Sequence, residues 1–136
     1  MKRLPRKPLP HRVTLIFDGS CGFCTRSVRL IRALDRERRV TAVPYQKPGT
    51  PEAHGLSFAQ CEAAIWAVTP ERERCSGAAA INTALSVALE IRLPLWLYAA
   101  PGVRRLQDLA YSLVARNRRR LPGDAPYCRQ HPEGCR

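Results

Sequence analysis

Two cysteines stand three positions apart in the run FDGSCGFC, which covers residues 17–24. The C-x-x-C spacing lets one thiol attack a disulfide while the other resolves the mixed disulfide, and it also suits metal ligation. Zinc ribbons normally need a second such pair, and no second C-x-x-C occurs in the chain. The spacing therefore favours redox chemistry, with Cys21 as the attacking thiol and Cys24 as the resolving one.

The cysteine pair lies where an apolar, β-prone run gives way to a helical pattern. Residues 13–17, VTLIF, predict a buried strand that ends in a turn, and from residue 22 the apolar residues recur at helical spacing. A helix that begins there offers Cys21 unpaired backbone N–H groups and a positive dipole end, which favour a thiolate. We therefore expect an exposed Cys21 to react first and Cys24, one turn deeper, to close the disulfide.

Asp18 lies between the predicted strand and the cysteine pair. Its carboxylate could accept or deliver a proton while the second thiol attacks. An Asp that precedes Gly also often binds its own backbone in a turn. Both interpretations stay open, and Asp18 joins Cys21 and Cys24 as a candidate catalytic residue. No metal and no cofactor is expected beyond the reversible Cys21–Cys24 disulfide.

The remaining pattern predicts an α/β domain with the order β-α-β-α-β-β-α and one extra C-terminal helical segment, which is the order of a thioredoxin-like domain. Ser57 and Gln60 form a capping box that opens one of the helices. The final helix carries an apolar face. The segments behind this prediction are strands at 40–45, 64–68 and 73–76, helices at 77–90 and after Pro101, and a face made of Val103, Leu106, Ala110 and Leu113.

Composition divides the 136 residues into three parts. A basic, proline-rich arm at residues 1–12 is expected to be disordered, and residues 121–136 form an irregular tail that contains cysteines. Between them, residues 13–120 form the domain. With 45% hydrophobic residues the chain suits one compact core.

The net charge of +12 raises the question of a polyanionic partner. Nucleic-acid modules interleave basic residues with exposed aromatics, but Phe, Trp and Tyr (3, 2 and 4 residues) fall mostly inside apolar runs. We therefore expect a solvated basic surface and no specific nucleic-acid site. Peripheral contact with an anionic membrane stays open.

The arm lacks the apolar stretch and cleavage site of a secretory signal, and no apolar run approaches the ~20 residues that span a bilayer. These features predict a cytoplasmic protein without a transmembrane segment. In a reducing compartment, six cysteines indicate redox or metal chemistry rather than a disulfide framework.

The run FDGSCGFCTRSVRLI resembles the DCC family of predicted thiol-disulfide oxidoreductases, named for the Asp, Cys and Cys of its D-x-x-C-x-x-C motif. The resemblance implies a thioredoxin-like fold and exchange at Cys21 and Cys24, with Asp18, on a disulfide-containing protein or small thiol substrate. One departure is that thioredoxins pack a proline before the third strand against their cysteines, and residues 57–68 contain none. The resemblance extends through Pro44-Tyr45-Gln46, Gly77 to Ala80, Asp108, Tyr111, Arg116-Asn117-Arg118 and Cys128.

Two other classes of function are weighed against exchange. A strand that ends in Asp resembles the start of a haloacid-dehalogenase phosphatase, but those enzymes need a second Asp two residues later, where Ser20 stands. A binding module without redox turnover, using the basic surface for nucleic acid or acidic lipid, is the other class. Its binding would weaken steeply with salt, whereas thiol exchange would not require such a dependence.

The tail carries its own cysteine motif. Cys128, His131 and Cys135 supply three candidate metal ligands, to which Cys21 and Cys24 could add, whereas a structural zinc site needs four, usually as two closely spaced pairs. A loosely held loop, a Cys128–Cys135 disulfide or regulatory thiol, and a metal site all stay open for this segment. Cys61 and Cys75 are expected to be single cysteines in the domain.

Overall fold

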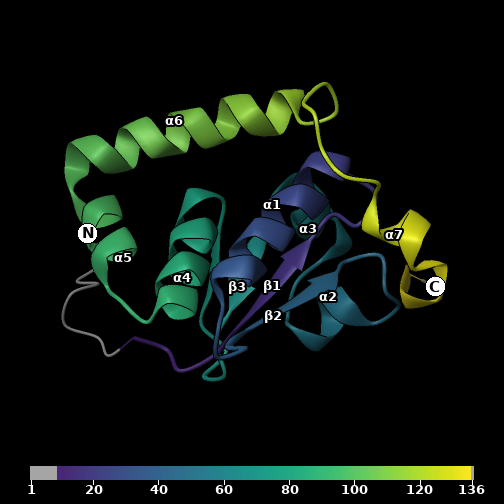
Figure 1. The fold of residues 1–136 in the computed structure, drawn as a ribbon, viewed down its shortest axis with the longest axis horizontal. Helices are drawn as coiled ribbons and strands as arrows, with labels where there is room; N and C mark the ends of the chain where they lie inside the picture. The colour runs from purple at the N-terminus through teal and green to yellow at the C-terminus, as the bar shows by residue number, and fades with distance from the viewer. Residues whose placement is uncertain (1–8, 136) are drawn as a thin grey trace.

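A computed structural model describes residues 9–135 of the chain. Its centre is a four-stranded sheet with the strand order β2-β1-β3-β4 (Figure 1). Strand β1 (Val13–Phe17) pairs in parallel with β2 (Val40–Pro44) and antiparallel with β3 (Trp66–Val68), which pairs antiparallel with β4 (Arg74–Ser76). A strand in the interior of a sheet packs on both faces, which is why the apolar run VTLIF forms β1.

Helices cover the sheet and extend beyond it. The helices are α1 (Gly22–Leu34), α2 (Thr50–Ala53), α3 (Phe58–Ala63), α4 (Ala78–Leu89), α5 (Leu93–Ala99), α6 (Pro101–Asn117), α7 (Tyr127–Gln130) and a 3-10 turn at Pro132–Cys135. The element order and sheet topology confirm the predicted thioredoxin-like α/β fold. The predicted capping box is also confirmed, because the Ser57 side chain accepts from the Gln60 N–H and Gln60 returns a bond to Ser57.

The core has two halves because alternate residues of β1 point to opposite faces of the sheet. On one face, Leu15 packs with Ile31 of α1 and Val87 of α4. On the other face, Ile16 packs with Leu56 and with Cys61 of α3. The two halves hold β1 rigidly and thereby position the turn that follows it.

Three segments differ from the sequence predictions. The segment after β2 contains the short helix α2, which has no place of its own in the predicted strands and helices, α5 forms as an additional helix before α6, and the tail expected to be irregular contains α7 and the 3-10 turn. The disorder expected of the basic arm concerns mainly residues 1–8, which lie outside the described residues; Leu9 packs against the core.

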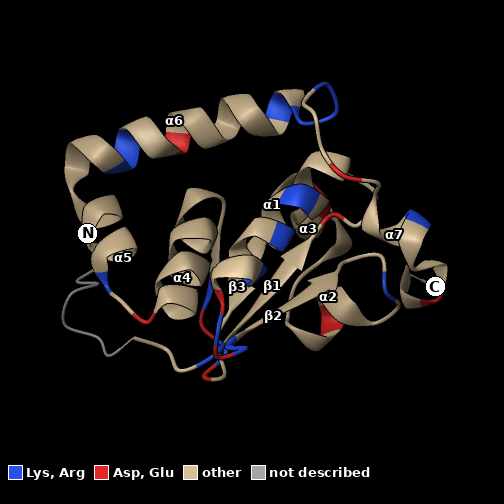
Figure 2. Ribbon diagram, viewed as in Figure 1, with Lys and Arg blue, Asp and Glu red and all other residues tan. Residues whose placement is uncertain are grey.

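The long helix α6 lies at the periphery, away from the sheet (Figure 1). None of its residues is buried, and of the predicted apolar face Leu106 and Leu113 are 67% and 51% exposed. Basic residues occur on α1, α6, α7 and the loops rather than on a single element (Figure 2). Within residues 9–135, no helix has the length and apolar character needed to cross a membrane.

Candidate active site

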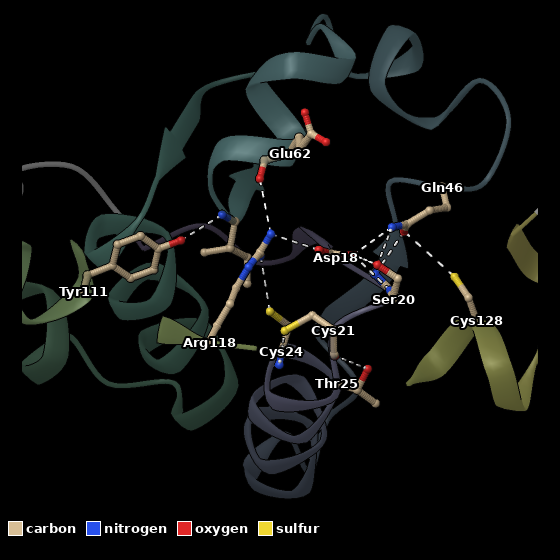
Figure 3. Close-up of polar contacts among 12 residues, drawn as sticks. Asp18, Ser20, Cys21, Cys24, Thr25, Gln46, Glu62, Tyr111, Arg118 and Cys128 are labelled. Atoms are coloured by element: carbon tan, nitrogen blue, oxygen red, sulfur yellow. Dashed lines mark hydrogen bonds and ion pairs between the residues drawn. The ribbon is translucent and has the colours of Figure 1, made fainter. Parts of the chain in front are cut away.

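Helix α1 begins directly after the turn that ends β1, and Cys21 is its N-cap residue. The Cys21 Sγ atom accepts a hydrogen bond from the backbone N–H of Cys24 at 3.1 Å, in place of the side-chain oxygen that usually caps a helix. The Cys21 N–H donates to the Asp18 carbonyl at 3.2 Å, which closes the turn. Both cysteines are free thiols, and they lie side by side at the N-terminal end of α1 (Figure 3).

The exposures of the two thiols are the reverse of the sequence prediction. Cys21 is only 3% exposed, whereas Cys24 is partly exposed. The prediction that Cys21 is the accessible thiol is therefore wrong for this conformation. The C-terminal segment, described below, packs on Gly19 and Gly22 on either side of Cys21, a contact that no local pattern indicates.

Asp18 is 3% exposed, as Cys21 is, and both oxygens of its carboxylate have polar partners. Oδ1 accepts from the Ser20 N–H at 2.9 Å, the Ser20 hydroxyl at 2.7 Å and Gln46 Nε2 at 2.7 Å. Oδ2 lies 3.0 Å from Arg118 Nη2, close enough for an ion pair, although the angles are not those of a hydrogen bond. Asp18 is thus both a turn residue and the anion that faces Arg118.

These contacts set the ionisation of Asp18. Burial alone raises the pKa of a carboxyl group, but the hydrogen bonds from Ser20 and Gln46 and the charge of Arg118 outweigh burial and hold the pKa of Asp18 below its ordinary 3.8. Asp18 is therefore an anion at neutral pH.

Arg118, the residue that ends α6, lies between Asp18 and the cysteine pair (Figure 3). Its Nη1 donates to the Cys24 sulfur at 3.5 Å, and its Nη2 donates to the Glu62 carbonyl at 3.4 Å. The side chain is 18% exposed. A guanidinium held in this way places a fixed positive charge beside the Cys24 sulfur.

The Cys24 thiol resists ionisation while Cys21 is free. Burial, followed by the hydrogen bond to Cys21 and the charge of Cys21, raises the pKa of Cys24 to about 12, and Arg118 acts in the opposite direction. Cys24 is therefore protonated near neutral pH while Cys21 is free.

The C-terminal segment, residues 122–135, packs against the turn that carries Cys21. The Asp124 N–H donates to the Gly22 carbonyl at 3.1 Å and the Cys128 N–H to the Gly19 carbonyl at 2.8 Å. A Cβ atom at Gly22 would lie 2.5 Å from the Asp124 carbonyl oxygen, so the close approach needs a glycine there. Arg29 of α1 adds an ion pair to Asp124 at 2.5 Å.

A disulfide joins Cys128 to Cys135 within this segment. Of the alternatives left open for the tail, the structure contains the Cys128–Cys135 disulfide and not a loosely held loop. Bonded sulfurs cannot serve as thiolate ligands, and no group of three or more metal-binding side chains occurs among residues 9–135. The Cys128 sulfur lies 3.9 Å from Gln46 Oε1, which links the segment to the partners of Asp18.

The two single cysteines lie away from this site. Cys61 is buried in the second half of the core, and its pKa is raised by burial and then by Glu52. The Cys75 sulfur lies 3.5 Å from the Thr83 hydroxyl. Neither forms a disulfide, in agreement with the prediction of single cysteines.

Several residues of the site carry no signal in composition or spacing. Only the family resemblance points to Gln46, Tyr111 and Arg118, and it assigns them no role. The structure places Gln46 on Asp18 and Arg118 on both Asp18 and Cys24, while the Tyr111 hydroxyl accepts the Ile65 N–H at 3.0 Å just before β3. Arg118 is one of many arginines, so only its recurrence in a family pattern could have indicated it.

A free C-x-x-C pair at the first helix of a thioredoxin-like sheet is the arrangement found in dithiol redox proteins as a class. The model of the DCC1-like thiol-disulfide oxidoreductase family matches residues 15–124, and the chain belongs to this family. The family predicted from the D-x-x-C-x-x-C motif is thereby confirmed. Comparison with curated proteins and with solved structures gave no match.

Proposed function

We propose that this protein catalyses thiol-disulfide exchange through a dithiol mechanism at Cys21 and Cys24. The observation that carries the proposal is the N-cap geometry, in which Cys21 Sγ accepts the Cys24 N–H and a second free thiol follows one turn later. The substrate is a disulfide-containing protein or a small disulfide or thiol. The chemistry needs no cofactor besides the pair itself.

In the first step the Cys21 thiolate attacks one sulfur of the substrate disulfide. A Cys21–substrate disulfide forms, and the other substrate sulfur leaves as a thiolate that takes a proton from solvent. Because Cys21 is only 3% exposed, this step requires the neighbouring chain to move. We assign that movement to the C-terminal segment, which contacts the same turn through Gly19 and Gly22.

In the second step Cys24 loses its proton and attacks the Cys21 sulfur. A Cys21–Cys24 disulfide forms, and the second substrate thiolate leaves, so two electrons pass to the substrate. Once Cys21 is bonded to substrate it carries no charge, and two of the causes that raise the pKa of Cys24 fall away. Arg118 then stabilises the Cys24 thiolate across 3.5 Å.

Asp18 is the third residue of the proposed site. A carboxylate with a lowered pKa is a weak base, which argues against direct proton transfer from the Cys24 thiol to Asp18. The ion pair to Arg118 supports a positioning role, in which Asp18 holds the guanidinium beside Cys24.

The test measures reduction of a small aromatic disulfide, 5,5′-dithiobis(2-nitrobenzoate), by the reduced protein. Cys21→Ser should abolish the fast release of the coloured thiolate, and Cys24→Ser should stop after one equivalent with a mixed disulfide on Cys21. Cys75→Ser is the matched control and should behave as the unchanged protein. Fast two-equivalent release by Cys21→Ser would refute the mechanism.

A further inference from the structure

Helix α6 exposes a row of leucines on the side that faces away from the domain. Leu106, Leu109 and Leu113 are 67%, 59% and 51% exposed, and their spacing of three and four residues places them on one face of the helix. The side that contacts the domain is a different one. It carries Gln107, whose Oε1 accepts from Asn82, and Tyr111, whose hydroxyl accepts from Ile65.

Helix α5 adds a second apolar surface beside α6. Its Tyr98 is buried and donates to Asp108 of α6 at 2.7 Å, which joins the two helices. On α5, Leu93, Trp96 and Leu97 are 52%, 60% and 42% exposed and share a face by spacing. Single exposed apolar residues are ordinary, but six large ones on two adjoining helices indicate an interaction surface.

The charge around these helices identifies the partner. Residues 92–120 contain seven arginines and one acidic residue, Asp108, which is engaged by Tyr98. Arg105 and Arg116 are exposed, and helical spacing places Arg105 beside Leu109 and Arg116 beside Leu113, along one edge of the leucine row. Figure 2 shows basic residues near both ends of α6. A second copy of this +12 chain would meet the same arginines and be repelled.

We propose that the outer face of α6, together with the exposed face of α5, docks on an anionic lipid bilayer. Exposed Leu and Trp would enter the interface while the arginines bind the headgroup phosphates, as in helices that lie in the plane of a membrane. Because α6 ends at Arg118, which contacts Cys24, docking holds the cysteine pair beside the bilayer. This surface function is separate from thiol exchange and does not depend on it.

The experiment is co-sedimentation of the full chain with vesicles of phosphatidylglycerol and phosphatidylcholine, and with pure phosphatidylcholine vesicles. We expect binding to the anionic vesicles that weakens as salt is raised, with the tryptophan emission shifted to the blue. Removing the leucine row with L106Q, L109Q and L113Q together should weaken binding by at least about tenfold, since three interfacial leucines are lost.

The matched control is the double variant L30Q and L34Q. These leucines of α1 are also exposed, at 51% and 46%, and they also lie among arginines, so this variant should bind as the unchanged protein. Absence of binding to anionic vesicles, equal binding by the triple variant, or loss in the α1 variant would each overturn the proposal. So would a concentration-dependent dimer in sedimentation that the triple variant abolishes. Thiol exchange of the triple variant without vesicles should be unchanged, which separates this test from that of the proposed function.

Discussion

Replacing Arg118 with Gln removes the positive charge beside Cys24 while retaining a polar side chain. Two unit charges 3.5 Å apart interact by about 5 kcal/mol at an effective dielectric constant near 20 and by about 1 kcal/mol in water. The Arg118 side chain is 18% exposed and is shared with the Asp18 anion, so the lower part of this range applies. We take about 1–2 kcal/mol for the thiolate of Cys24, which lowers the thiolate fraction by roughly five- to thirtyfold.

The effect on rate is smaller than the effect on ionisation. A thiol that ionises less readily is a stronger nucleophile once ionised. With a Brønsted coefficient of about 0.4–0.5, this gain in nucleophilicity offsets close to half of the lost thiolate fraction on a logarithmic scale. The resolving step of Arg118→Gln should therefore be slower by about two- to eightfold at neutral pH. Its pH profile should also move toward alkaline pH, because Arg118 lowers the pKa of Cys24 in the unchanged protein.

Stopped-flow release of the second aromatic thiolate from the reduced protein measures this step. Arg119→Gln is the matched control, since Arg119 is an exposed neighbour, and Arg118→Lys should recover part of the rate because it retains a charge. A second phase of unchanged rate and unchanged pH profile in a folded Arg118→Gln protein would refute the role assigned to Arg118.

The remaining predictions concern Asp18 and the C-terminal segment. Asp18→Asn should slow the resolving step with little change in the first release. If both steps of the variant run at the rates of the unchanged protein, Asp18 is a turn residue only. Because the folded-state pKa of Asp18 is lowered, its carboxylate stabilises the fold above pH 3.8, and this contribution is lost as the pH falls through the folded pKa; acid unfolding of Asp18→Asn should accordingly depend less on pH in that window. Replacing both Cys128 and Cys135 with Ser should speed the alkylation of Cys21 by iodoacetamide, and an unchanged rate would show that the disulfide does not hold the segment over the turn. Gly22→Ala should speed the same alkylation, because its Cβ would meet a carbonyl oxygen of the segment at 2.5 Å, and a protected thiol in this variant would contradict the contact.

The elements around the cysteine pair were predictable because their signals are local. Strand β1 has the predicted bounds, Val13–Phe17, since its apolar run is short and ends in a turn that favours glycine and aspartate. The N-cap position of Cys21 also follows from neighbouring residues. The capping box at Ser57 is a pattern of four residues and was confirmed for the same reason.

The errors and omissions come from contacts between distant residues. The C-terminal segment packs on the turn that carries Cys21, where the Cys128 N–H donates to the carbonyl of Gly19, more than a hundred positions earlier. Arg118 reaches Asp18 from a hundred positions along the chain, at the far end of a helix whose apolar face the sequence cannot orient. A periodic pattern shows that a helix has an apolar side, but it does not show whether the domain or a partner covers it.

The central claim is that Cys21 and Cys24 form a reversible disulfide. The most direct measurement equilibrates the protein with graded mixtures of oxidised and reduced dithiothreitol, alkylates the free thiols and maps the disulfides by mass spectrometry. The account predicts a Cys21–Cys24 bond that forms and breaks as one two-electron couple while Cys61 and Cys75 stay free. A pair that never forms, or a Cys21 that bonds only to Cys61 or Cys75, would contradict it.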